Sequence, residues 1–327
     1  MRRAEFVSRF LIVVGIALAI VVPTLFWSGT PLIHVSMAEA GGWSPDTLRA
    51  EVGKPLELHL TSDDVVHGFA VGQMEMESVD VLPGKVTDIT LRFEKPGTYT
   101  FYCTRWCGVN HWRMRGTIEV SGSNPTAELA AIPLYVKLGI DIDAPHEAAV
   151  VPSNKPSAGG GQQLAGDYEI SQFNNTDFYR ANSPYQAFES LNSTSLNDSQ
   201  KWDMVSYIWQ SNTTPESLAN GKKLYAQNCA ACHGENRAGN GVFADDLKAA
   251  GEASGQAMTG SEEMKIQSPA DFTNPTRILG ASPALLQGKI LRGGMGTGMP
   301  MWGSIFTEKQ IWDLISYLYS FQFEYEK

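Results

Sequence analysis

The chain changes its hydrophobic period once, and this change requires at least two differently built domains. Residues 45–121 form short segments of alternating apolar and polar residues, separated by turn signals such as Pro-Gly at 83–84 and 96–97. After about residue 165 the apolar residues recur with helical spacing. The stretch between them, residues 122–165, contains VPSNKPSAGGGQQ, a composition typical of linkers. The sequence therefore predicts a small antiparallel β-sandwich, a linker and a helical region.

Composition supports a folded protein of this size. The chain has 327 residues, of which 43% are hydrophobic and 18% are charged, as in globular proteins with sizeable cores. Its formal net charge of -10 argues against nucleic acid as a partner and leaves room for a basic protein partner.

The N-terminus has the pattern of a membrane anchor. Three arginines in the first nine residues precede an uncharged run from Phe10 to Trp27. We expect residues 1–30 to form a single transmembrane helix with a cytoplasmic N-terminus, which places the remaining domains in the periplasm or outside the cell. A cleaved secretory signal is the alternative, since Ala38-Glu39-Ala40 offers a cleavage site.

Residues 103–114, CTRWCGVNHWRM, combine metal-ligand side chains in a C-x3-C-x3-H-x2-M frame. His67 adds a lone imidazole at the end of an earlier predicted strand. A disulfide within C-x3-C would close a short ring of poor geometry. Thiolate, imidazole and thioether ligands suit copper, whereas structural zinc has little use for a thioether. A second cysteine in the same loop allows two thiolates to bridge two copper ions.

Together with the preceding VHGF and PGTYTFYC segments and the following GTIEV, this frame resembles the CuA domain of haem-copper oxidase subunit II. The resemblance implies a cupredoxin sandwich over residues 40–121 that holds a binuclear copper centre (CuA). In this arrangement both cysteines bridge the two coppers, each histidine binds one copper, and a thioether and a backbone carbonyl are weak axial ligands. The implied ligands are His67, Cys103, the carbonyl of Arg105, Cys107, His111 and Met114.

Arg105 is a departure from the family pattern. Many of these oxidases have a glutamate here that helps to bind a magnesium or manganese ion, so we do not expect that ion site in this chain. A hydrophobic shell is expected from Phe69, Phe101, Trp106 and Trp112. The histidines at 34, 59 and 146 are expected to be structural surface residues.

The second cysteine pair belongs to a different motif. Cys229, Cys232 and His233 form C-x2-C-H, the signature of covalent c-type haem attachment, although a bare motif also occurs in other redox proteins. An amphipathic segment precedes it, and a Met-Pro in a glycine-rich loop and a terminal amphipathic segment follow it. These surroundings favour haem attachment.

This order resembles a class I cytochrome c over residues 215–325, within an all-α domain that we place at 213–327. The resemblance implies that Cys229 and Cys232 attach one haem c, that His233 is the proximal ligand and that Met299 is the distal ligand. Met295 and Met301 compete for the distal role. The terminal helices are expected to cross where Gly221 and Tyr225 meet Leu314 and Tyr317. The stretch 251–268 reads as an insertion.

An internal repeat at an offset of 110 residues relates NDSQKWDMVSYIW at 197–209 to TEKQIWDLISYLY at 307–319. We interpret residues 166–212 as a truncated copy of the last half of the cytochrome c domain. The copy contains no C-x2-C-H, so we expect it to bind no haem. Chance similarity of two amphipathic helices is the alternative.

The combined order of domains predicts the electron-transfer subunit (subunit II) of a membrane cytochrome c oxidase with a fused cytochrome c. Electrons would pass from a soluble or membrane donor, of cytochrome c or cupredoxin type, to haem c, to CuA and on to a catalytic haem-copper subunit I. The alternatives are the corresponding subunit of a CuA-containing nitric oxide reductase and a free membrane-tethered carrier. Nitrous oxide reductase is excluded because six histidines cannot also supply its four-copper site.

Overall fold

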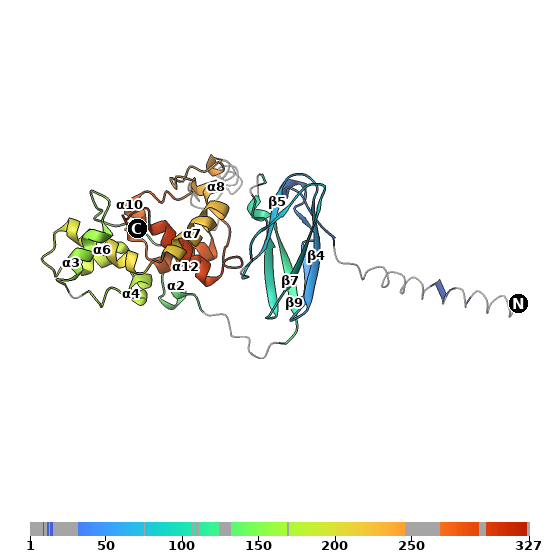
Figure 1. Cartoon of the computed structure of the whole chain (residues 1–327), viewed down its shortest axis with the longest axis horizontal. Coiled ribbons are helices and arrows are strands. Elements are labelled where there is room, and N and C mark those ends of the chain that lie inside the picture. Colours follow the sequence, from blue (N-terminus) through green and yellow to red (C-terminus); the bar gives the residue numbers. More distant parts are fainter. Residues whose placement is uncertain are drawn as a thin grey trace, which may run out of the picture.

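The computed structural model describes residues 9, 12, 14, 15, 32–74, 76–105, 107, 108, 111–123, 132–168, 170–245, 269–293 and 299–325. They form a β-sandwich beside a helical unit (Figure 1). Helices α7, α8 and α12 lie on the side of the helical unit that faces the sandwich, and α3 and α6 lie at its far end.

The sandwich consists of two sheets. One has four strands in the order β2-β1-β4-β7, and the other has five strands in the order β3-β9-β8-β5-β6. The strands are β1 (Leu32–Val35), β2 (Trp43–Ser44), β3 (Thr47–Glu51), β4 (Pro55–Ser62), β5 (His67–Val71), β6 (Val79–Val81), β7 (Val86–Arg92), β8 (Gly97–Tyr102) and β9 (Arg115–Ser121). The prediction of an all-β sandwich is confirmed, and six of these strands fall in the segments that alternation indicated.

Three short strands were not expected, and one of them extends the sandwich beyond the predicted start at residue 40. Strand β1 pairs in parallel with β4 from Leu32 to Val35. Its inward residues, Ile33 and Val35, are fully buried. Four residues, of which only two face inward, give too short an alternation to be recognised in sequence.

The helical unit contains α2 (Leu134–Lys137), α3 (Ala158–Ala165), α4 (Thr176–Ala181), α5 (Pro184–Ser190), α6 (Asp198–Ser211), α7 (Pro215–Asn228), α8 (Ala230–His233), α10 (Pro275–Gly280), α11 (Pro283–Arg292) and α12 (Glu308–Tyr319). All of these helices except α2 and α8 begin at side-chain caps. Thr307 and Gln310 form a capping box at α12, and Asn197 and Gln200 form one at α6. These caps satisfy backbone N–H groups that the first helical turn leaves without partners.

The described part of the expected linker is largely packed against the helices. Asp143 forms a bidentate ion pair with Arg292 of α11, with N–O distances of 2.6 and 2.7 Å. Residues 158–165 form helix α3 rather than an extended linker. Its Gly-Gly-Gly run has poor helix propensity, so tertiary contacts determine its conformation.

Two helix pairs of this unit make matching close contacts at a glycine. A Cβ on Gly221 of α7 would overlap the Asp313 carbonyl and the Tyr317 side chain of α12. A Cβ on Gly161 of α3 would overlap Asp203 and Tyr207 of α6 in the same manner. Helices α3 and α6 therefore contact each other at a glycine, as α7 and α12 do.

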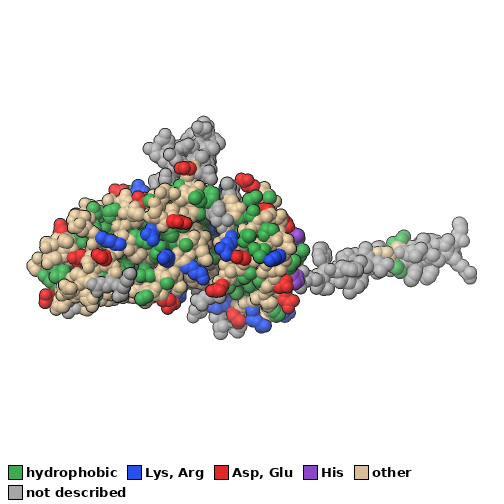
Figure 2. Space-filling view, turned by 45° about the horizontal axis from the view of Figure 1, so that its top comes forward, with side chains coloured by type: hydrophobic (Ala, Val, Ile, Leu, Met, Phe, Trp, Pro, Cys, Tyr) green, Lys and Arg blue, Asp and Glu red, His purple; other side chains and the backbone are tan. Residues whose placement is uncertain are grey.

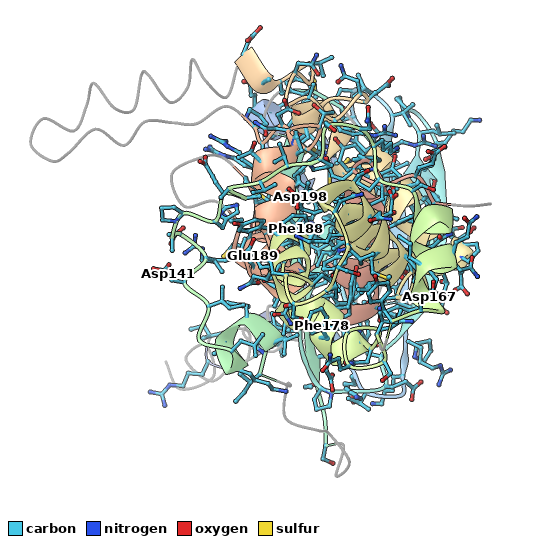
Figure 3. The ribbon with its side chains drawn as sticks, turned by 90° about the vertical axis from the view of Figure 1, so that its left-hand side faces the viewer. Asp141, Asp167, Phe178, Phe188, Glu189 and Asp198 are labelled. Carbon is cyan, nitrogen blue, oxygen red and sulfur yellow. The ribbon has the colours of Figure 1, made fainter. Side chains whose placement is uncertain are left out.

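The copy and the cytochrome-like helices share one hydrophobic core. Trp209 of α6 contacts Tyr319 of α12 edge-on, with ring centroids 5.9 Å apart. Figure 3 shows the end of the molecule that the copy forms, with Phe178 and Phe188 labelled on α4 and α5. Phe188 stacks on Trp202 at 4.7 Å. The two halves of the helical unit therefore form one folded body.

Two expected features cannot be followed in the structure. The anchor at 1–30 lies outside the described residues except for four isolated positions, and the insertion at 251–268 lies outside them entirely. Within the residues that are described, no helix has both the length and the apolar character to cross a membrane. On the described part of the face in Figure 2, acidic and basic side chains are interspersed.

The helix crossing leads to a stability prediction. Replacing Gly221 with alanine should destabilise the helical unit by about 1–3 kcal/mol, because the added methyl group overlaps backbone atoms of α12. Gly166 has open space around its Cβ position and an ordinary helical φ of -67°, so Gly166→Ala is the matched control. Thermal melting of the full chain, followed by helical circular dichroism, should show a lower midpoint for the first variant only. Equal midpoints would contradict the close crossing.

Candidate metal centre and haem site

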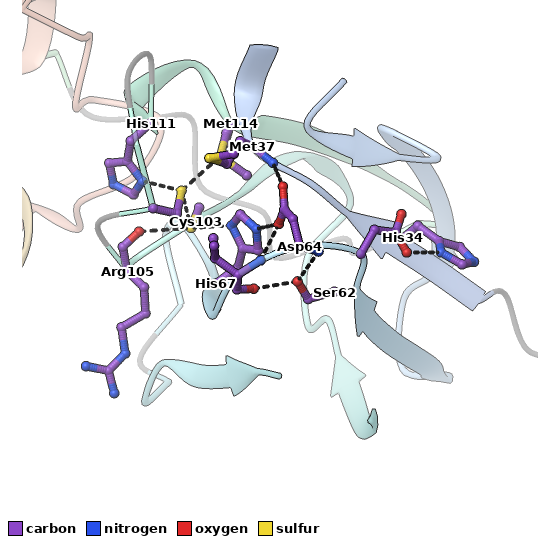
Figure 4. A network of polar contacts seen from close by, with 12 residues as sticks. His34, Met37, Ser62, Asp64, His67, Cys103, Arg105, His111 and Met114 are labelled. Carbon is purple, nitrogen blue, oxygen red and sulfur yellow. Dashed lines mark hydrogen bonds and ion pairs between the residues drawn. The ribbon is translucent and has the colours of Figure 1, made fainter. Parts of the chain in front are cut away.

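Sulfur and nitrogen groups converge at one end of the sandwich (Figure 4). The Sγ atoms of Cys103 and Cys107 are 3.8 Å apart. Nδ1 of His67 lies 3.7 Å from the first sulfur, and Nδ1 of His111 lies 3.4 Å from the second. The Met114 Sδ atom is 3.2 Å from Cys107 Sγ. The structure therefore brings together all five side chains that the sequence indicated.

Three elements position these groups. His67 is the first residue of β5, and Cys103 directly follows β8. Strand β5 pairs antiparallel with β8, with Ala70 opposite Tyr102, so the histidine and the cysteine come to the same end of the sheet. The loop from β8 to β9 contains Cys107 and the short helix His111–Arg113, which bring the remaining ligands back to the same point.

The two cysteines are both free and buried. Their separation is far beyond a disulfide bond length of about 2 Å. The hydrogen bond from the Cys107 thiol lowers the pKa of Cys103 to about 3, and the same interaction raises the pKa of Cys107. The Gly68 N–H also donates to the Cys103 sulfur at 3.5 Å. One thiolate is thus already stabilised by the protein.

Asp64 orients the His67 ring. Its Oδ1 atom lies 2.7 Å from His67 Nε2, and its carboxylate also accepts the backbone N–H groups of Met37 and Val65. Burial lowers the pKa of His67, but the contacts with Cys103 and Asp64 outweigh this effect and raise it. A carboxylate at Nε2 fixes the ring so that Nδ1 faces the sulfurs, as outer-shell partners of metal-binding histidines do.

The backbone carbonyl and the side chain of Arg105 face in different directions. Its backbone carbonyl oxygen lies 3.3 Å from Cys103 Sγ and so faces the cluster. Its guanidinium turns outward and forms a bidentate ion pair with Asp80, with both N–O distances at 2.8 Å. The side chain therefore contributes surface charge pairing and no ligand to the cluster.

Aromatic residues cover the inner side of the cluster. Phe69 and Phe101 are fully buried and stack at 5.6 Å. Trp43, which the sequence did not single out, contacts both rings edge-on and donates its Nε1–H to the Met114 carbonyl at 3.1 Å. Trp106 lies outside the described residues, as does the side chain of Trp112.

This donor set fits soft metal ions. His67, Cys103 and Cys107 each offer a ligand atom, and these atoms all lie within 4.8 Å of one another. Two thiols, two imidazoles, one thioether and one carbonyl exceed the ligands that a single tetrahedral zinc ion uses. Thiolate and thioether sulfur selects copper over hard cations.

The second candidate site lies at the junction of α7 and α8. Cys229 ends α7, and Cys232 and His233 belong to the short helix α8. Both thiols are free, and burial raises the pKa of Cys229 to about 12 and that of Cys232 to about 11. One helical turn thus carries both thiols and the imidazole.

The His233 ring is held by its surroundings. Its Nδ1 atom donates to the Ala270 carbonyl at 3.0 Å, and the ring stacks on Phe272 at 4.7 Å. Burial lowers the pKa of His233. A neutral imidazole with its proton on Nδ1 keeps Nε2 as the coordinating atom.

Three methionines were considered for the opposite side of this site. Met299 is partly buried and packs against the helical core, as Cys229 does. Met301 is 63% exposed, and Met295 lies outside the described residues. The packing is consistent with Met299 rather than Met301.

The remaining histidines stay apart from both sites. His34 pairs with Asp63, His59 pairs with Asp88, and His146 contacts a backbone carbonyl. The sequence did not assign Asp64, Trp43 or Ala270 to either site. One sequence signal pointed to Asp64, its position three residues before His67, but Asp63 is a second carboxylate only one residue further away.

Several proteins named cytochrome c oxidase subunit 2 match part of this chain. Two sequences from Thermus thermophilus named cytochrome c oxidase subunit 2 are each 38% identical over 84 residues, which is 26% of this chain and 62% and 49% of their own lengths. The matches therefore span less than two thirds of these relatives. An alternative cytochrome c oxidase subunit 2 from Bradyrhizobium diazoefficiens is 34% identical over 24% of this chain and 27% of its own length.

A solved structure, the periplasmic domain of subunit II of cytochrome oxidase from Bradyrhizobium japonicum, is 27% identical. It covers 23% of this chain and 54% of its own, with a TM-score of 0.22.

Two family models match separate parts of the chain. Residues 46–121 match the cytochrome c oxidase subunit II periplasmic domain, which implies copper, and residues 218–322 match cytochrome c, which implies haem. These ranges contain the sulfur cluster and the C-x2-C-H segment, respectively. The sandwich is therefore similar to the cytochrome c oxidase subunit II periplasmic domain, and residues 218–322 are similar to cytochrome c.

Proposed function

We propose that this chain is the electron-transfer subunit of a membrane cytochrome c oxidase. Electrons enter at one haem c, pass to a binuclear copper centre and leave to a catalytic haem-copper subunit I. The observation that carries this proposal is the convergence of two thiols, two imidazoles and a thioether in a subunit II domain that is fused to a C-x2-C-H helix.

The sandwich residues have distinct tasks at the copper centre. Cys103, Cys107, His67, His111, Met114 and the Arg105 carbonyl would hold the copper ions, with the two cysteines shared between them. When bound, the copper pair and the haem take up and release single electrons. The sandwich supplies a rigid, buried ligand frame, because both cysteines and Met114 are buried. A frame that does not rearrange keeps the reorganisation on electron exchange small.

The helical unit has the corresponding tasks at the haem. Cys229 and Cys232 would attach it, and His233 and Met299 would be its ligands. The Ala270 carbonyl holds the imidazole in one tautomer. Histidine and methionine ligation raises the haem potential.

The partners follow from the subunit II family. A periplasmic domain of this family indicates a membrane-associated subunit. We propose that residues 1–30 anchor it as a single span with the N-terminus in the cytoplasm. A soluble or membrane donor of cytochrome c or cupredoxin type reduces the haem, and the copy at 166–212 carries no haem.

Turnover of the purified membrane complex tests the proposed function. The complex should consume oxygen when supplied with a reduced donor protein, and turnover should stop when Cys107 is replaced by serine. Consumption of nitric oxide without oxygen turnover would instead assign the chain to a nitric oxide reductase. Purification without any catalytic membrane subunit would make it a free carrier.

Asp64 should strengthen copper binding through His67. Asp64→Asn keeps the shape of the side chain but removes its charge, so we expect copper affinity to fall by about tenfold or more. Asp63→Asn is the matched control, because Asp63 is adjacent and pairs with the distant His34. Competition with a copper chelator measures both affinities. Equal affinities would show that Asp64 has no role at the metal.

Met299 should set the haem potential. Met299→Ala removes the thioether ligand and should lower the reduction potential, because methionine ligation raises it. Met301→Ala, at an exposed position two residues away, should leave the potential unchanged. Redox titration of the haem absorbance compares the two variants. A lower potential in Met301→Ala alone would reassign the distal ligand.

A further inference from the structure

The sandwich and the helical unit meet at a specific backbone contact. Gln73, in the turn after β5, lies against the segment that precedes α12, which is the red loop that reaches the sandwich in Figure 1. Its backbone N–H donates to the Ile305 carbonyl at 2.8 Å. Its Nε2 atom donates to the Gly303 carbonyl at 2.6 Å and to the Phe306 carbonyl at 2.8 Å. Gln73 thus donates hydrogen bonds to three backbone carbonyl groups of the helical unit.

The local backbone is adapted to this contact. Gly72 approaches Ser304 and Ile305 so closely that a Cβ would overlap their backbone atoms. Gln73 has a φ of +64°, in the left-handed region that residues other than glycine rarely adopt. Such strain persists only where surrounding contacts hold it, and here these include the contacts across the domain boundary.

Arg115 makes a second contact between the domains. Its Nη1 atom donates to the Met301 carbonyl at 3.0 Å, and its guanidinium lies over the Trp302 ring at 5.5 Å from the centroid. Burial lowers the pKa of Arg115, against the opposing influence of Tyr102. A partly desolvated cation above an aromatic face is a favourable arrangement that also fixes orientation. The exposed pair Lys223–Glu77, at 3.9 Å, adds little.

These contacts adjoin the proposed ligands on both sides. Arg115 directly follows Met114, and Tyr102 directly precedes Cys103 and packs against the helical core. On the helical side, the contacted segment begins two residues after Met299. Contacts at these positions connect the two ligand loops through few covalent bonds.

We propose that Gln73 and Arg115 form a clamp that holds the segment 301–306 on the sandwich, and that both are positioning residues for electron transfer between the two sites. This inference rests on the proposed function. Domains within one chain move relative to each other by default unless their interface fixes them. Electron transfer slows steeply as the gap between centres widens, so a fixed contact determines its rate.

The test is flash reduction of haem c in the full, cofactor-loaded chain, with the rate of electron arrival at copper as the readout. Gln73→Ala and Arg115→Ala should each lower the rate by about tenfold or more, as expected for loss of hydrogen bonds that fix the docked state. Arg115→Lys should recover part of the rate, since it retains the charge. Arg49→Ala is the matched control, because Arg49 lies exposed on β3 of the same sheet.

Two further readouts separate positioning from damage. In the clamp variants, the spectra and reduction potentials of copper and haem should stay unchanged. Solution X-ray scattering should show a larger maximum dimension for Gln73→Ala and Arg115→Ala only. Arg115 is adjacent to a proposed ligand. If Arg115→Ala alters the copper spectrum, the rate measured with Gln73→Ala decides the test. An unchanged rate in Gln73→Ala would overturn the clamp, whereas no transfer in the unmodified chain would overturn the proposed function.

Discussion

The pairing of two cysteine sulfurs at 3.8 Å is the constraint on which the sandwich site depends. A disulfide would remove both ligands, and a wider separation would prevent them from sharing metal ions. The protein holds this spacing with the β8–β9 loop, while the N–H of Gly68 and the buried His67 supply polar contacts to Cys103. Asp64 then fixes the imidazole from behind. Cys103 and His67 are therefore each oriented by neighbouring groups of the protein.

The helical unit applies a second constraint, the close crossing of two helices at a glycine. Gly221 lets α7 approach α12, and the C-x2-C-H turn begins where α7 ends. Gly161 permits a similar contact between α3 and α6, and Trp209 of α6 packs against Tyr319 of α12. A copy without cysteine or histidine thus extends the core that supports the haem-binding helices. The clamp at Gln73 then connects this body to the sandwich.

Local patterns predicted much of this structure, and long-range contacts account for the rest. Strands such as β4 and β7 alternate over seven or eight residues, and the cluster in CTRWCGVNHWRM is contiguous, so both could be read from sequence. Helix α3 could not, because its glycine run reads as linker and only packing against Asp203 and Tyr207 makes it helical. Asp63 and Asp64 are equivalent in sequence, and only the fold turns one of them toward His67.

The central claim is that Cys103 and Cys107 share two copper ions in one site. Metal analysis combined with electron paramagnetic resonance of the copper-loaded full chain tests this most directly. The account predicts two copper ions per sandwich. In the oxidised form, one unpaired electron is spread equally over both nuclei, and replacing Cys107 with serine abolishes this shared signal. A single copper per chain, with hyperfine splitting from one nucleus, would contradict it.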